Sequence, residues 1–222
     1  MSLGSVRGAV FFDVDGTLVP GTSSSQHLAS YLGHRDVLQR AEDDYAEGRM
    51  DNREVSLLDA QGWQGRSERD IERYLADLPL VDGIADVVTW CRDQDLAVCL
   101  ATLAWEPVGR HLCRRFGFAG ACGPRLTQRG GTYTGGVAEH VDEFDKRDFA
   151  VRTAADLGLP LTACAAVGDS RSDLPLFAAV GFPVAFNADS GARAVAATSV
   201  EGPDLRAVLP ALAEWLGRAQ HA

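Results

Sequence analysis

Four short apolar runs, spaced widely along the chain, are the clearest pattern in the sequence. The first covers residues 6–13 and is rich in valine and phenylalanine, a composition that favours a buried strand. We predict three more strands of this kind at residues 97–101, 163–167 and 182–186. A further short strand is predicted near Ser199 and Val200.

Helical patterns occupy the segments between these runs. The segment from residue 21 to 81 contains no strand pattern, and four helices are predicted there, at residues 26–32, 37–45, 53–59 and 68–78. Glycines separate them, as glycine interrupts helices readily. Six later helices are predicted at residues 84–94, 107–116, 146–157, 173–180, 192–197 and 205–216. Residues 123–136 alternate around Gly130-Gly131, which predicts a hairpin.

The alternation of strands and helices indicates an α/β fold, with a doubly wound parallel sheet covered on both faces. Residues 1–20 and 82–222 are predicted to form this α/β core domain. Residues 21–81 are predicted to form a small all-helical domain inserted after the first strand. No internal repeat interrupts this organisation.

Composition and charge narrow the function. The chain has 222 residues, 46% of them hydrophobic, which suffices for one core and a small second lobe. Its formal net charge of −10 argues against nucleic acid as a partner, because phosphate backbones are repelled. A small phosphorylated substrate stays possible, since a bound metal can reverse the local sign. The sequence indicates no oligomeric state.

The location expected from the sequence is the cytoplasm. No apolar stretch approaches the roughly 18 residues that suggest a membrane span, so no membrane partner is expected. Residues 1–8 contain one arginine and no long apolar region, which argues against a signal peptide. The five cysteines include no Cys-x-x-Cys pair and are interpreted as free thiols in a reducing compartment.

Polar residues stand at the ends of three predicted strands. Asp13 and Asp15 end the first, Thr102 follows the second, and Asp169 ends the third, with Asp173 shortly after. Ligands of open parallel sheets bind outside the carboxyl ends of the strands, so these groups should converge. Four carboxylates in one crevice would repel strongly, and a divalent cation is the simplest remedy. Hard oxygen ligands suit Mg²⁺.

The residue types also fit phosphoryl transfer. An aspartate can attack phosphorus and form an aspartyl-phosphate, and a second carboxylate nearby can protonate the leaving oxygen. The Gly16-Thr17 pair after the aspartates allows a sharp turn and offers backbone N–H groups to phosphate oxygens. Thr102 and Lys146 could hold the transferring group and offset its charge. In the alternative interpretation Asp13 and Asp15 only cap a turn, and Asp173 only caps the helix that follows.

At this point the chain resembles the haloacid dehalogenase (HAD) superfamily of phosphohydrolases. Residues 13–19 (DVDGTLV) look like its first motif, Thr102 its second, Lys146 its third and residues 168–173 its fourth. The helical insertion after the first motif is similar to the cap domain of the phosphoserine-phosphatase-like branch, as is the hairpin at residues 125–135. The resemblance implies a HAD-like Rossmannoid core and a Mg²⁺-dependent phosphomonoesterase of small metabolites that works through an aspartyl-phosphate.

The resemblance also implies roles for single residues. The implied catalytic residues are Asp13 as nucleophile, Asp15 as acid and base, and Thr102 and Lys146 as phosphoryl ligands. The implied Mg²⁺ ligands are Asp13, the backbone carbonyl of Asp15, and Asp169, with Asp173 in support of Lys146 or a metal-bound water. The implied substrate contacts are Gly16, Thr17, Thr22 and Leu103.

The chain departs from phosphoserine phosphatases at several of these places. They carry a glutamate that binds the substrate amine, where this chain has Thr22, and their Ser-Gly-Gly second motif is here Thr102-Leu103-Ala104. No arginine matches the one that binds the substrate carboxylate; Arg53 is the nearest basic residue. Phosphoserine is therefore not the expected preferred substrate, although Asp43, Asp44 or Glu47 could compensate.

Four alternative functions stay open on the sequence. The nearest is phosphoserine phosphatase proper. A dehalogenase of the same superfamily typically lacks the second aspartate, so Asp15 argues against it. A phosphomutase uses both aspartates. A regulatory phospho-acceptor protein also phosphorylates an aspartate, but it is much shorter and has no helical insertion.

Overall fold

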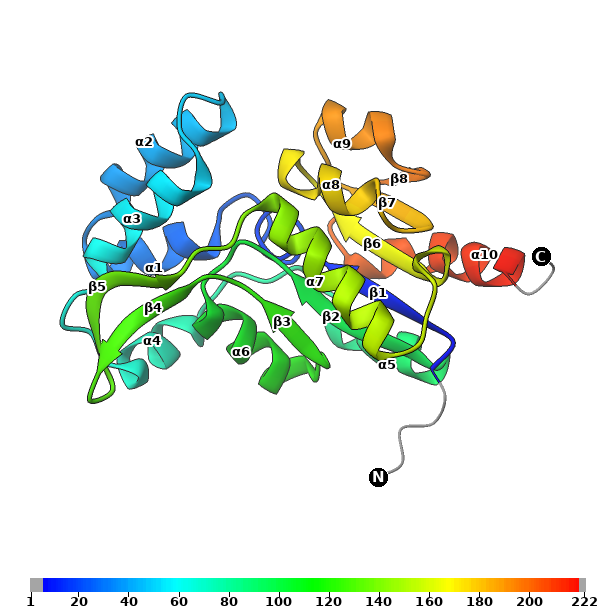
Figure 1. Cartoon of the computed structure of the whole chain (residues 1–222), viewed down its shortest axis with the longest axis horizontal. Coiled ribbons are helices and arrows are strands. Elements are labelled where there is room, and N and C mark those ends of the chain that lie inside the picture. Colours follow the sequence, from blue (N-terminus) through cyan, green and yellow to red (C-terminus); the bar gives the residue numbers. More distant parts are fainter. Residues whose placement is uncertain (1–5, 220–222) are drawn as a thin grey trace.

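A six-stranded parallel sheet organises the structure, a computed structural model that describes residues 6–219 (Figure 1). The strand order is β3-β2-β1-β6-β7-β8. The strands are β1 (Gly8–Phe12), β2 (Leu96–Ala101), β3 (Gly120–Cys122), β6 (Cys164–Gly168), β7 (Phe182–Phe186) and β8 (Thr198–Val200). The predicted doubly wound α/β fold is confirmed. The chain builds outward from β1 in both directions, which places a topological switch point beside that strand.

Helices cover both faces of this sheet. Val10 and Phe12 of β1 pack with α5 (Ile84–Asp93), α6 (Glu106–Phe116) and α10 (Leu209–Ala219). Ala9 and Phe11 point to the opposite face and pack with α7 (Glu143–Asp156), α8 (Leu174–Phe177) and α9 (Ser190–Val195). Because successive residues of a strand face opposite sides, β1 is buried on both.

The segment after β1 is helical, as predicted. It contains α1 (Ser24–Leu32), α2 (Arg35–Ala46), α3 (Asn52–Gly62) and α4 (Glu68–Leu75). The predicted hairpin forms as β4 (Arg125–Arg129) and β5 (Thr132–Glu139) and packs against α3, so it lies with these helices at the left of Figure 1. Tyr133 fixes it there through backbone hydrogen bonds to Gly65 and Arg66, both 2.9 Å. The division into domains at residues 20/21 and 81/82 stays a prediction.

Several boundaries differ from the sequence prediction. The edge strand β3 was not predicted, because three residues carry too little pattern. Helix α7 starts at Glu143, three residues before the predicted start, because Asp142 caps it through the backbone N–H groups of Phe144 and Asp145. The predicted helix at 205–216 is a 3₁₀ turn (Leu205–Val208) followed by α10.

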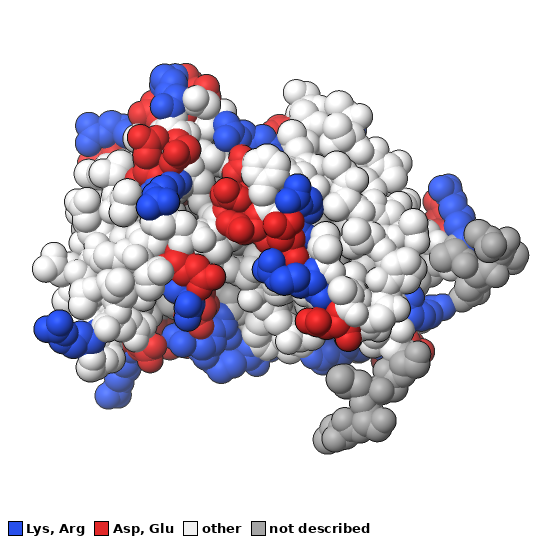
Figure 2. All heavy atoms as spheres, viewed as in Figure 1, with Lys and Arg blue, Asp and Glu red and all other residues white. Residues whose placement is uncertain are grey.

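No helix among residues 6–219 is both long and apolar enough to cross a lipid bilayer. On the face shown in Figure 2, acidic and basic side chains are interspersed, and acidic ones gather near the start of α7.

Candidate active site

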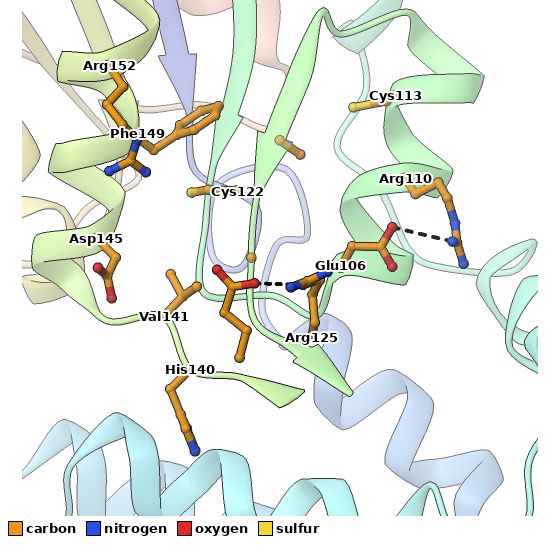
Figure 3. Close-up of a pocket in the computed structure, with 13 residues that line it drawn as sticks. Glu106, Arg110, Cys113, Cys122, Arg125, His140, Val141, Asp145, Phe149 and Arg152 are labelled. Atoms are coloured by element: carbon orange, nitrogen blue, oxygen red, sulfur yellow. Dashed lines mark hydrogen bonds and ion pairs between the residues drawn. The ribbon is translucent and has the colours of Figure 1, made fainter. Parts of the chain in front are cut away.

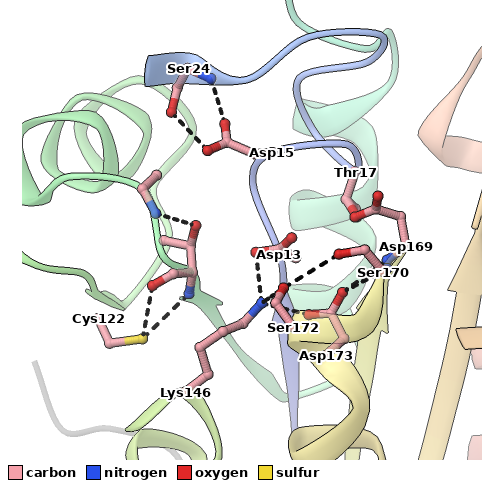
Figure 4. Close-up of polar contacts among 12 residues, drawn as sticks. Asp13, Asp15, Thr17, Ser24, Cys122, Lys146, Asp169, Ser170, Ser172 and Asp173 are labelled. Carbon is pink, nitrogen blue, oxygen red and sulfur yellow. Dashed lines mark hydrogen bonds and ion pairs between the residues drawn. The ribbon is translucent and has the colours of Figure 1, made fainter. Parts of the chain in front are cut away.

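The first motif forms a tight loop at the carboxyl end of β1 (Figure 4). The N–H of Asp13 continues the sheet ladder by donating to the carbonyl of Val167, at 2.9 Å. Gly16 has a φ of +87°, and a Cβ there would lie 2.1 Å from a carboxylate oxygen of Asp169. Only glycine fits this position, since any other side chain would be strained in φ and would collide with Asp169.

Lys146 lies beneath the loop and joins two motifs. Its side chain is completely buried, and its Nζ donates to Asp13 Oδ1 at 3.0 Å and to Asp173 Oδ1 at 2.6 Å. A third hydrogen bond, at 3.2 Å, goes to Ser172 Oγ. Burial alone would lower the pKa of Lys146, but the two carboxylates raise it above its usual value. The lysine is therefore a charged ammonium group inside the protein.

The single positive charge of Lys146 cannot neutralise all of the carboxylates that lie close together here. Oxygens of Asp13, Asp169 and Asp173 lie within 4.8 Å of one another. Burial, with a contribution from neighbouring acids, raises the pKa of Asp13 to about 7 and that of Asp169 to about 8, although Lys146 opposes both. This donor set of hard oxygens fits a divalent cation such as Mg²⁺, which would relieve the repulsion.

Asp173 differs from Asp13 and Asp169 because both of its carboxylate oxygens accept hydrogen bonds from the surrounding chain. Its Oδ2 accepts hydrogen bonds from the backbone N–H groups of Asp169 and Ser170, at 3.0 and 3.2 Å. Its Oδ1 accepts from Lys146. Because both oxygens are occupied, Asp173 holds Lys146 and the fourth-motif loop together; its predicted support of Lys146 or of a metal-bound water stays a prediction.

The carboxylate of Asp15 points away from this cluster toward the start of α1 (Figure 4). Its oxygens accept hydrogen bonds from the N–H and the hydroxyl of Ser24, at 2.6 and 3.1 Å. Burial raises its pKa, and the bonds from Ser24 oppose this. A partly buried carboxyl group with a raised pKa is suited to giving and taking a proton.

Thr102 stands at the end of β2, adjacent to the first motif. Its side chain is 1% exposed, and its Oγ1 accepts a hydrogen bond from Ala104 N at 3.0 Å. The thiol of Cys122, on β3, lies 3.4 Å from the Thr102 backbone nitrogen and supports the end of the strand. Thr102 therefore ends the strand in a defined position beside Asp13.

A cavity of about 220 Å³ lies between the carboxyl edge of the sheet and helices α1–α3. Four of the predicted residues line it: Asp13, Asp15, Thr102 and Leu103. Gly16, Thr22 and Asp169 line an adjoining cavity that shares Asp15 with the first. Thr17 lines neither, because it is fully buried and its hydroxyl donates to Asp169 Oδ1 at 3.2 Å.

Two helix faces that we did not predict as part of the site complete the cavity. One is the face of α2 with Leu38, Glu42 and Tyr45, and the other is the face of α3 with Asn52, Val55, Ser56 and Asp59. The spacings i, i+4, i+7 and i, i+3, i+4, i+7 place each set on one side of its helix. That spacing was a usable signal in the sequence, but it does not tell what the face covers.

A larger hollow of about 450 Å³ lies beside the edge strand β3 (Figure 3). Ion pairs between Arg125 and Glu139, at 2.6 Å, and between Arg110 and Glu106, at 3.4 Å, cross its wall. Among the described residues, none of the aspartates of the four motifs lines it. The chemistry is therefore assigned to the smaller cavity.

The fold and the site together define an α/β protein with an acidic site at the carboxyl edge of its parallel sheet. A family model described as haloacid dehalogenase-like hydrolase matches residues 10–178. The chain belongs to this family, so the predicted family and the assignment as a hydrolase are confirmed.

Named relatives and solved structures agree with this family. The chain is 31% identical over 216 residues to "Phosphoserine phosphatase SerB1" of Mycobacterium tuberculosis, covering 86% of this chain and 68% of the relative. It is 26% identical over 207 residues to a phosphoserine phosphatase of Albidiferax ferrireducens, covering 90% and 87%. A structure titled as a phospho-aspartyl intermediate analogue of phosphoserine phosphatase has a TM-score of 0.82, 21% identity, and coverage of 92% and 98%. That structural similarity supports the fold.

Proposed function

We propose that this protein hydrolyses phosphate monoesters of small metabolites through an aspartyl-phosphate on Asp13. The observation that carries the proposal is the placement of Asp13 and Asp15 on one wall of a cavity, with the ammonium of Lys146 directly beneath Asp13. The names of the relatives, two of them phosphoserine phosphatases, support a phosphatase.

Each residue has a defined task in this reaction. A carboxylate oxygen of Asp13 attacks phosphorus, and the bond from phosphorus to the leaving oxygen breaks while Asp15 gives that oxygen a proton. Asp15 then takes a proton from water, which attacks the same phosphorus and releases Asp13 and inorganic phosphate. Lys146 and Thr102 bind the phosphoryl group and offset its charge.

Asp13, Asp169 and the backbone carbonyl of Asp15 would hold Mg²⁺, in agreement with the crowding of these carboxylates. When bound, the ion supplies positive charge to the phosphoryl oxygens.

We also propose a cytoplasmic location, supported by the five cysteines, all of which are free thiols.

We expect removal of divalent metal to abolish activity. Without the cation, the phosphate dianion would enter a site already crowded by carboxylates. Turnover of p-nitrophenyl phosphate should disappear in EDTA and return with excess Mg²⁺. Mg²⁺ should also raise the melting temperature, because it binds only the folded chain, and Asp169→Asn should remove this shift. Full activity in metal-free buffer would contradict the proposed cofactor.

We expect Asp15→Asn to retain substrate binding and to slow turnover by roughly two to four orders of magnitude, the usual contribution of acid–base catalysis. Asparagine can still accept the hydrogen bond from the Ser24 N–H through its Oδ1, and its amide group can donate to the Ser24 hydroxyl, so α1 should keep its position. The defect should shrink with esters whose leaving group needs no proton, such as p-nitrophenyl phosphate compared with alkyl phosphates. An equal loss on both ester types would argue against Asp15 as the acid.

A further inference from the structure

The charged side chains that line the cavity are all acidic. They are Asp13, Asp15, Glu42 and Asp59, and no lysine or arginine is among the described residues that line it. Lys146 lies below the cavity and is already bonded to Asp13 and Asp173. Beyond the phosphoryl group, therefore, a substrate in this cavity meets a lining whose charged side chains are all negative.

Glu42 of α2 is held in place by neutral groups only. Its Oε1 accepts a hydrogen bond from Ser23 Oγ at 2.7 Å, and its Oε2 accepts one from Gln26 Nε2 at 2.8 Å. No described lysine, arginine or histidine forms an ion pair with it; the exposed Arg35 lines the adjoining cavity, which Glu42 also lines. Burial raises the pKa of Glu42 to about 7, and the charges of Asp15 and Asp59 act in the same direction.

Asp59 of α3 adds a second negative charge to the same wall. Its carboxylate accepts hydrogen bonds from Trp105 Nε1 at 2.6 Å, Trp63 Nε1 at 3.3 Å and His34 Nε2 at 2.7 Å. Asp59 therefore accepts three hydrogen bonds where Glu42 accepts two, so Asp59 contributes charge but has less remaining capacity to contact a ligand. Glu42 is therefore the acid of this wall best placed to meet one.

The same cavity offers a hydroxyl group without a partner. The hydroxyl of Tyr45 is buried and forms no hydrogen bond among the described residues, although the guanidinium of Arg171 lies 4.3 Å from the centre of the Tyr45 ring; Tyr45 follows Glu42 on the cavity face of α2. A buried polar group without a partner is unfavourable, so a bound ligand that offers it a hydrogen bond would be stabilised.

We propose that the substrate is an amino-alcohol phosphate, in which a cationic amine contacts Glu42 and no carboxylate is present. An ammonium group would neutralise the partly buried Glu42, because a charge withdrawn from water is stabilised by an opposite charge. A carboxylate on the same head group would be repelled by the acids that line the cavity. Amino-acid phosphates such as phosphoserine are therefore disfavoured, and this inference rests on the phosphatase function proposed above.

The acids weighed from the sequence as substitutes for the missing glutamate were Asp43, Asp44 and Glu47, and none of them lines the cavity. The structure assigns this position to Glu42, one residue earlier on the same helix. Thr22, which aligns with the glutamate of phosphoserine phosphatases by counting, lines the adjoining cavity instead.

The test compares three esters with the wild-type protein in Mg²⁺: O-phosphoethanolamine, L-phosphoserine and glycerol 3-phosphate, with p-nitrophenyl phosphate as reference. We expect kcat/KM for phosphoethanolamine to exceed that for each of the other two natural esters by at least about tenfold, which corresponds to about 1.4 kcal/mol. Any other ranking overturns the inference. Absence of p-nitrophenyl phosphate hydrolysis would instead refute the phosphatase function itself.

Glu42→Gln identifies the residue responsible. Glutamine keeps the size of the side chain and can still accept the hydrogen bond from Gln26, but it removes the charge. We expect kcat/KM for phosphoethanolamine to fall at least about tenfold, mainly through KM, and kcat/KM for p-nitrophenyl phosphate to change less than about threefold. The matched control is Asp43→Asn, which removes an exposed charge from the same helix. This variant should leave kcat/KM unchanged for both esters. An equal loss on both esters would assign Glu42 a structural role and overturn the proposal.

Discussion

Asp13→Asn is expected to abolish turnover, with a fall in kcat of about four to six orders of magnitude, as for other enzymes that lose a covalent nucleophile. Asparagine has nearly the shape of aspartate, and its oxygen can still accept the hydrogen bond that Lys146 donates to Asp13. The amide is not a nucleophile, so no aspartyl-phosphate can form. We expect the folded structure to persist, because Lys146 keeps its second carboxylate, Asp173.

Two measurements check this expectation: kcat on p-nitrophenyl phosphate, and labelling of the protein by beryllium fluoride, which mimics an acyl phosphate. Both should be lost in Asp13→Asn. The control is Asp148→Asn, because the carboxylate of Asp148 is 45% exposed, pairs with Arg147 and does not line the cavity. Near-normal activity of Asp13→Asn would refute the assignment of the nucleophile.

Lys146→Met is expected to abolish turnover and also to destabilise the protein by about 3–5 kcal/mol, the usual effect of breaking a buried ion pair. Methionine fills a similar volume, but the carboxylates of Asp13 and Asp173 would then lie buried without a positive partner. The destabilisation should be measured by urea denaturation in EDTA, so that no divalent ion replaces the missing ammonium.

Arg147→Met is the matched control for this experiment. Arg147 is the next residue on α7, its side chain is 38% exposed, and its partner is Asp148. Exposed pairs contribute about 0–1 kcal/mol, so this variant should be nearly as stable as the parent. Adding Asp173→Asn to Lys146→Met should restore part of the lost stability, because one unpaired charge is removed. Equal effects of the two methionine variants would contradict the buried position of Lys146.

The sheet could be predicted because its information is local. Four of the strands are continuous apolar runs, at residues 8–12, 96–101, 164–168 and 182–186. A short run of this kind is typical of a strand that is buried on both faces, so it can be recognised without knowledge of the rest of the fold. The three-residue strand β3 could not be predicted, since it is a strand only because β2 offers it backbone partners. The position of the hairpin against α3 likewise depends on distant contacts, such as those of Tyr133.

The first, second and fourth motifs could be placed together from the chain alone. Asp13, Thr102 and Asp169 follow strands of one parallel sheet, and the carboxyl ends of parallel strands lie at one edge. The position of Lys146 could not be predicted in the same way, because nothing in the sequence of a helix indicates that one of its lysines is buried. Its complete burial follows from the packing of α7 over Asp173 and the end of β1.

The wall of the cavity was decided only by the tertiary structure. The face of α2 that contains Glu42 and the face of α3 that contains Asp59 are recognisable as faces, but their direction depends on how the helices pack over the sheet edge. That packing is set by long-range contacts, such as the indole of Trp105 donating to Asp59, 46 residues apart. The reactive residues at the strand ends can therefore be predicted from the local sequence. The groups that would select a substrate lie on separate helices, and only the folding of the chain brings them together.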